Sequence, residues 1–172
     1  MKDIIWSQFG ASIEMLKNAI NACPENLWSD RTQIPEFWYL VYHTLFWLDF
    51  YLTDDPANYS PPKPFNLSEL DPEGKLPDRV YTKVELLNYL TFCRRKCEET
   101  LNNITDEKAK QNYKFGSVEM SFGEIIIYNL RHVQHGTGQL NLILRQKIDD
   151  SPKWVKRDSN QNIQSNSHDR NL

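Results

Sequence analysis

The chain has 172 residues, a formal net charge of −3 and 40% hydrophobic residues, a composition typical of one globular domain. This charge balance, without a block rich in Lys and Arg, argues against a nucleic-acid-binding surface and against a polybasic membrane anchor. No apolar run approaches the roughly 20 residues of a membrane span and the N-terminus lacks a signal-peptide pattern, so we expect a cytoplasmic protein with no membrane partner.

The first half of the chain contains two predicted helices. In residues 3–21 apolar side chains recur every three or four positions, as on an amphipathic helix, and Pro24 ends the segment. A second helix is predicted to open at Pro35 and to run to about Leu52. Its residues are apolar around nearly the whole circumference, so this helix should be buried on most sides.

A long proline-rich connection follows. Residues 54–81 contain six prolines, which argues against a continuous helix or strand. In a bundle of helices, a connection of this length is a crossover that lets consecutive helices run parallel.

Two capping boxes predict the remaining helices. Thr82 and Glu85 open a third helix that continues to about residue 102, and Ser121 and Glu124 open a fourth that continues to about residue 147. We expect residues 105–120 between them to be an irregular connection.

The fold class predicted from these elements is all-α: a four-helix bundle with a long crossover connection between the second and third helices. The bundle should occupy residues 1–157, and residues 158–172 are polar enough to predict a mobile tail.

The three cysteines, an odd number, argue against a disulfide framework. Cys93 and Cys97 are four residues apart and would share one helical face, as a redox or metal-binding pair could. Leu86, Leu90 and Leu101 lie on the same face, so we favour two reduced thiols that fill the core.

Three of the four histidines lie inside predicted helices. On the fourth helix, polar residues fall within roughly 80° of arc and predict an internal polar cavity. This polar stripe consists of Glu124, Tyr128, His132, His135 and Gln139. On the second helix, His43 could reach the same interior. Imidazoles from two facing helices could bind a divalent metal, Zn²⁺ or Ni²⁺, and activate a bound water or thiol. Alternatively, each His makes hydrogen bonds in the core or faces solvent.

Two segments resemble a known family. Residues 42–52 (YHTLFWLDFYL) and residues 128–140 (YNLRHVQHGTGQL) are similar to the two sequence hallmarks of the DinB/YfiT-like superfamily, and the likeness covers roughly residues 1–155. The resemblance implies a four-helix bundle, often a homodimer, with a divalent metal held by one His of the second helix and two of the last. Characterised relatives include thiol-dependent transferases and a mycothiol-dependent isomerase.

By this resemblance, His43 matches the ligand of the second helix and His132 the first ligand of the last helix. The family's third ligand lies four residues further on, where this chain has Gly136. Either His135 replaces that ligand after a local shift of the helix, or the metal site is degraded. We expect that Gly136→His would restore the family's pair of histidines and tighten metal binding.

Two functions are compatible with this pattern. The first is a metal-dependent hydrolase or thiol S-transferase that acts on a small electrophile, with a low-molecular-weight thiol as a candidate co-substrate. The second is a ligand-binding or structural helical bundle with a degraded metal site, and a metal-free bundle of unrelated origin is the alternative to the family itself. The aromatic load of the second helix, including Trp38, Tyr39, Tyr42, Phe46 and Tyr51, further predicts a homodimer interface.

Overall fold

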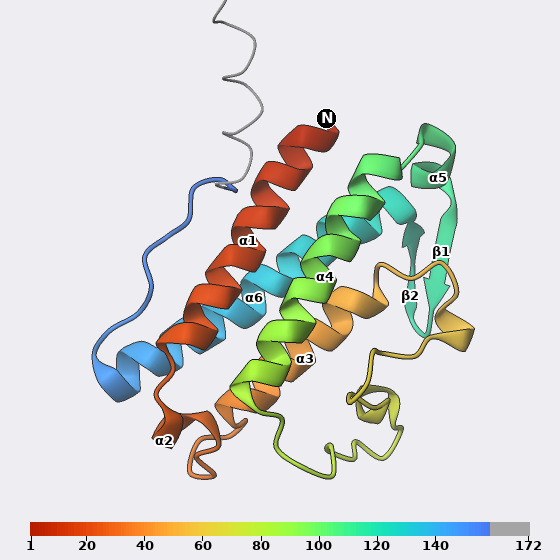
Figure 1. Cartoon of the computed structure of the whole chain (residues 1–172). Coiled ribbons are helices and arrows are strands. Elements are labelled where there is room, and N and C mark those ends of the chain that lie inside the picture. Colours follow the sequence, from red (N-terminus) through yellow and green to blue (C-terminus); the bar gives the residue numbers. More distant parts are fainter. Residues whose placement is uncertain (159–172) are drawn as a thin grey trace, which may run out of the picture.

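The computed structural model describes residues 1–158, and this part of the chain is mostly helical (Figure 1). Its four long helices are α1 (Lys2–Ala22), α3 (Phe37–Phe50), α4 (Lys83–Asn103) and α6 (Phe122–Ile148). α1 packs against α4 and α6, and α3 packs against the same two helices. The prediction of a mainly helical chain is therefore confirmed. None of the helices in the described chain has the length and apolarity needed to cross a bilayer.

The helix ends follow the local signals in the sequence. α1 ends two residues before Pro24. α4 begins after a capping box in which the Thr82 backbone N–H donates to Glu85 Oε2 at 2.8 Å. The Ser121 backbone N–H donates to Glu124 Oε2 at 2.9 Å in the same way at the start of α6. Both predicted capping boxes are confirmed.

The prediction that residues 105–120 are irregular is wrong. They form α5 (Asp106–Lys110) and most of an antiparallel hairpin of β1 (Asn112–Phe115) and β2 (Val118–Ser121), and the single turn of α2 (Glu25–Trp28) was also not expected. The hairpin is stabilised by contacts with residues far away in the sequence. The local pattern of two four-residue strands does not predict such contacts. Tyr113 is buried, and the ring of Phe115 lies 4.5 Å from that of Phe50 between centroids.

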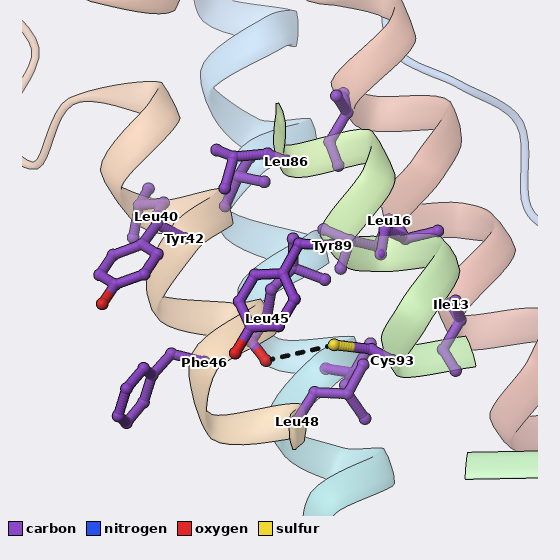
Figure 2. Close-up of a cluster of buried hydrophobic side chains, with 14 of the residues drawn as sticks. Ile13, Leu16, Leu40, Tyr42, Leu45, Phe46, Leu48, Leu86, Tyr89 and Cys93 are labelled. Carbon is purple, nitrogen blue, oxygen red and sulfur yellow. Dashed lines mark hydrogen bonds between the residues drawn. The ribbon is translucent and has the colours of Figure 1, made fainter. Parts of the chain in front are cut away.

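The core lies between the four long helices. Figure 2 shows Leu45 of α3 beside Tyr89 and Cys93 of α4. The aromatic residues from which we predicted a dimer interface are mostly covered by the chain itself. Trp38, Tyr42, Phe46 and Tyr51 are buried, and Tyr39 is half-buried. The aromatic content of α3 therefore needs no second chain to cover it.

Both thiols of α4 are part of this core. Cys93 and Cys97 are fully buried with free thiols, and Cys93 Sγ lies 3.7 Å from the Leu45 carbonyl oxygen (Figure 2). Burial raises the pKa of each thiol far above its ordinary range, which keeps both protonated and unreactive. The prediction that they fill the core is confirmed.

The connection between α3 and α4 (residues 51–82) is tied to the helices at several points. It contains two short 3₁₀ turns, η1 (Pro56–Asn58) and η2 (Ser68–Leu70). The Tyr42 hydroxyl donates to the Asn66 carbonyl at 2.8 Å, and Trp28 Nε1 donates to the Tyr81 carbonyl at 2.9 Å. The Tyr42 bond holds the segment just before η2 against the middle of α3, and the Trp28 bond holds the end of the connection against α2.

After α6 the chain returns along α1, as the blue segment in Figure 1 shows. The backbone N–H of Asp158 donates to the Ser7 carbonyl at 3.0 Å, and Arg94 Nη2 lies 2.7 Å from Asp158 Oδ1. Gly10 permits this close approach, because a Cβ there would lie 2.9 Å from the Asp158 side chain. The prediction of a mobile tail from residue 158 is therefore wrong for Asp158, which is a buried anchor. The rest of the predicted tail, residues 159–172, lies outside the described residues.

Candidate functional site

The candidate site begins with a histidine that meets a buried carboxylate. His43 lies in the middle of α3, and its Nδ1 is 2.7 Å from Oε2 of Glu69 in η2. Trp47, one turn further along α3, donates its Nε1–H to the same oxygen at 3.0 Å. The side chain of Glu69 is 5% exposed, whereas that of His43 is 38% exposed. His43 therefore has one face on a buried acceptor and another open to solvent.

The second histidine comes from the neighbouring helix. α6 packs on α3, and this contact brings the ring of His132 to 5.4 Å from that of His43 between centroids. Nε2 of His132 is buried and has no hydrogen-bond partner among the described residues. An unsatisfied nitrogen in such a position is costly unless a ligand, ion or water completes it.

Acidification should destabilise the fold through His132. Burial, and after it the nearby His43 and His135, lowers the pKa of His132 to about 4 from its ordinary value of about 6.5. Below about pH 6.5 the unfolded chain therefore binds a proton that the folded chain excludes. The free energy of unfolding should fall by up to about 3 kcal/mol as the pH drops to about 4.

Urea unfolding at several pH values between about 7.5 and 4.5 measures this loss. His132→Gln, whose amide does not titrate, should show a weaker pH dependence than the wild type. Parallel pH profiles of the two proteins would contradict the assignment.

The other members of the predicted polar stripe lie on or near the surface. His135 is exposed and lines a depression of about 510 Å³ together with Tyr128, Arg131 and His132. Glu124 is exposed, and its carboxylate is used by the capping box of α6. Gln139 is also exposed. The stripe runs along the edge of the contact between α6 and α3, so the structure places Glu124 and Gln139 on the surface and not in an interior cavity.

Gly136 lies in the contact between α6 and α3. A Cβ at this position would overlap Thr44 Oγ1 and come within 3.1 Å of Thr44 Cγ2. Thr44 is fully buried, and its hydroxyl donates to the Leu40 carbonyl at 2.7 Å. The expectation that Gly136→His would simply restore a ligand is corrected by this packing, because no side chain fits there unless Thr44 moves.

Two imidazoles of the site are about as far apart as two ligands of one metal ion. Imidazoles bound to one tetrahedral Zn²⁺ through nitrogens at about 2.0–2.1 Å place their centroids about 5 Å apart. The separation of His43 and His132 is close to this value. His135 is near enough to influence the pKa of His132. However, within residues 1–158 no group of three His, Cys, Asp or Glu side chains is arranged to hold a metal ion.

Sequence reasoning missed Glu69. It lies in the proline-rich connection, where local patterns predict no regular element, and it is 26 residues from its partner His43. The one sequence signal is Trp47, which has an indole donor one helical turn after His43. The indole N–H of Trp47 predicts a hydrogen-bond acceptor on this face of α3, but the sequence does not identify the residue that supplies it.

Comparison of the chain with protein-family models, with curated proteins and with solved structures found no match.

Proposed function

We propose that the chain is a metal-dependent enzyme of the DinB-like type that acts in the cytoplasm. In this proposal the four long helices form a four-helix bundle, and residues 51–82 are its crossover. His43 and His132 are metal ligands, and His135 at the rim is the third. The proposal rests on one observation above all: the buried Nε2 of His132 has no partner and lies beside a histidine whose Nδ1 is already engaged.

The ligand set suits Zn²⁺ or Ni²⁺, because neutral imidazole nitrogens bind these ions well. Such an ion, when bound, supplies a Lewis acid that activates water or a thiol. The protein's own residues shape the rest of the site. The depression lined by Tyr128, Arg131 and His135 opens beside His132, and it is the proposed place for a small electrophile and, in a transferase, a low-molecular-weight thiol.

Metal analysis of protein purified without a metal-affinity column tests the proposal. The wild type should contain one equivalent of Zn²⁺ or Ni²⁺, and both His43→Ala and His132→Ala should reduce it to background, because each removes one of two close ligands. His135→Ala should cause a smaller loss. Gln146→Ala, an exposed change on the same helix, is the control and should keep the metal. An unchanged metal content in both single-His variants would contradict the proposed ligands.

A second candidate function is favoured by two observations. His135 is exposed, and Gly136 is packed against Thr44, so the third ligand of the family pattern is not in place. The chain would then be a ligand-binding or structural bundle with a degraded metal site. Failure of the wild-type protein to bind Zn²⁺ or Ni²⁺ in excess would favour this candidate over the enzyme.

The proposed oligomer is a homodimer, which now rests on the family resemblance alone. Sedimentation of the full chain at tens of micromolar, an order-of-magnitude range for specific interfaces, should give the mass of two copies. A monomer throughout that range would contradict the proposal.

A further inference from the structure

Glu69 is a buried acid that the proposed ligand set does not use. Its side chain is 5% exposed, and Oε2 is the meeting point of two donors, Nδ1 of His43 at 2.7 Å and Nε1 of Trp47 at 3.0 Å. Its Oε1 is buried and has no hydrogen-bond partner among the described residues. Burying a carboxylate costs free energy, and the hydrogen bonds from these two donors must offset that cost.

The turn that carries Glu69 is also bonded to α3 through Tyr42. The Tyr42 hydroxyl donates to the Asn66 carbonyl at 2.8 Å, and the Ser68 backbone N–H donates to Asn66 Oδ1 at 3.1 Å. Tyr42 directly precedes His43 in the chain, so the helix that presents the imidazole also holds the turn that presents the carboxylate. Glu69 is therefore held in place by contacts other than its own bond to His43.

The bond between Glu69 and His43 has only one sensible direction. The indole N–H of Trp47 can only donate, so Glu69 Oε2 is the acceptor in that bond at 3.0 Å. The same oxygen lies 2.7 Å from His43 Nδ1, and a carboxyl oxygen that accepts one hydrogen bond has a second lone pair for another. His43 must carry a proton on Nδ1, and in the neutral ring the free electron pair is on Nε2.

We propose that Glu69 is a positioning residue that holds His43 as the Nδ1–H tautomer, with its Nε2 free to bind a metal or to accept a proton. A carboxylate behind a ligating histidine commonly fixes the ring in this way and makes its nitrogen a better donor. The inference deepens the proposed function and rests on it for the use made of Nε2, but not for the tautomer itself.

Nitrogen NMR of uniformly ¹⁵N-labelled, metal-free, full-length protein tests the tautomer directly. At about pH 8, where a histidine is neutral, the ring of His43 should show a protonated Nδ1 and an unprotonated Nε2. Its signals are identified by their loss in His43→Gln. An Nε2–H tautomer in the wild type would overturn the proposal, and this result needs no change to Glu69.

Glu69→Met keeps most of the side-chain volume but removes the acceptor, so the Nδ1–H preference should weaken. Glu69→Gln, whose amide oxygen still accepts, should retain it. Glu73→Gln, an exposed change in the same connection, is the matched control. If Glu69→Met leaves the tautomer as in the wild type, Glu69 does not set it and the proposal fails.

Affinity for Zn²⁺ alone, measured by competition with a chelator, gives a second readout. Glu69→Met should weaken binding by roughly 10- to 100-fold, and Glu69→Gln should recover part of the loss. If Glu69 had only a structural role, its variants would lose Zn²⁺ affinity only when they also lost free energy of unfolding. Recovery of affinity in Glu69→Gln, with the free energy of unfolding unchanged, would therefore not be expected from a structural role. If the wild type binds no Zn²⁺ but shows the predicted tautomer, the proposed metal function fails while the role of Glu69 is supported.

Discussion

Replacing Asp49 by Ala is expected to lower the free energy of unfolding by about 3–5 kcal/mol, the usual cost of removing one partner of a buried ion pair. The side chain of Asp49 is 1% exposed. It accepts hydrogen bonds from Lys96 Nζ at 2.5 Å, Tyr59 Oη at 2.6 Å and Tyr89 Oη at 3.0 Å. The variant would leave an ammonium group and two hydroxyls without this acceptor.

The effect should be large because Asp49 joins three parts of the chain. It belongs to α3, Tyr89 and Lys96 belong to α4, and Tyr59 belongs to the connection between these helices. Burial, together with the negative charge of Asp49, raises the pKa of both tyrosines, so they remain protonated donors.

Urea unfolding of the two proteins at neutral pH measures the difference. The matched control is Glu99→Ala on α4, the helix that carries Lys96. This variant removes an exposed ion pair in which Arg95 Nε is 3.9 Å from Glu99 Oε1. Exposed pairs contribute at most about 1 kcal/mol, so this variant should unfold almost as the wild type does. Equal losses in the two variants would show that the Asp49 network does not stabilise the fold.

The helix boundaries could be predicted from the sequence because they depend on neighbours in the chain. The hydroxyl of Thr82 and the carboxylate of Glu85 complete their hydrogen bonds within four residues, so the motif alone specifies the start of α4. The partners of Asp49 are 10, 40 and 47 residues away. Only the packed structure brings such groups together, and the sequence gives no sign of their pairing.

The candidate site was predictable to a similar degree. Helical spacing was enough to select His43 and His132 as residues of facing helices, and the packing of α3 on α6 brings their rings together. The same spacing placed Glu124 and Gln139 beside them, because an arc of roughly 80° does not say where the helix contact ends. Glu124 already had a local use as a helix cap, and that local bond is the one the structure shows.

Gly136 and Gly138 are expected to respond in opposite ways to alanine, although they are two residues apart on α6. A Cβ at Gly138 meets nothing within 4 Å, so Gly138→Ala should stabilise the protein by up to about 1 kcal/mol through helix propensity. A Cβ at Gly136 would overlap Thr44, and overpacking of this kind costs about 1–3 kcal/mol. Gly136→Ala should therefore lower the melting temperature while Gly138→Ala raises it.

The same overlap decides the outcome of Gly136→His. The imidazole must first displace Thr44, whose hydroxyl is bonded to the Leu40 carbonyl, so the single variant should lose stability and gain no affinity for Zn²⁺. Thr44→Ala removes the two closest atoms, and the next closest atom, the Cβ of residue 44, lies at 3.2 Å. The double variant should therefore recover part of the lost stability and bind Zn²⁺ more tightly than Thr44→Ala alone, as thermal unfolding and chelator competition would measure. A single Gly136→His variant as stable as the wild type, with tighter Zn²⁺ binding, would show that α3 and α6 separate at little cost and that Thr44 does not keep the third ligand out.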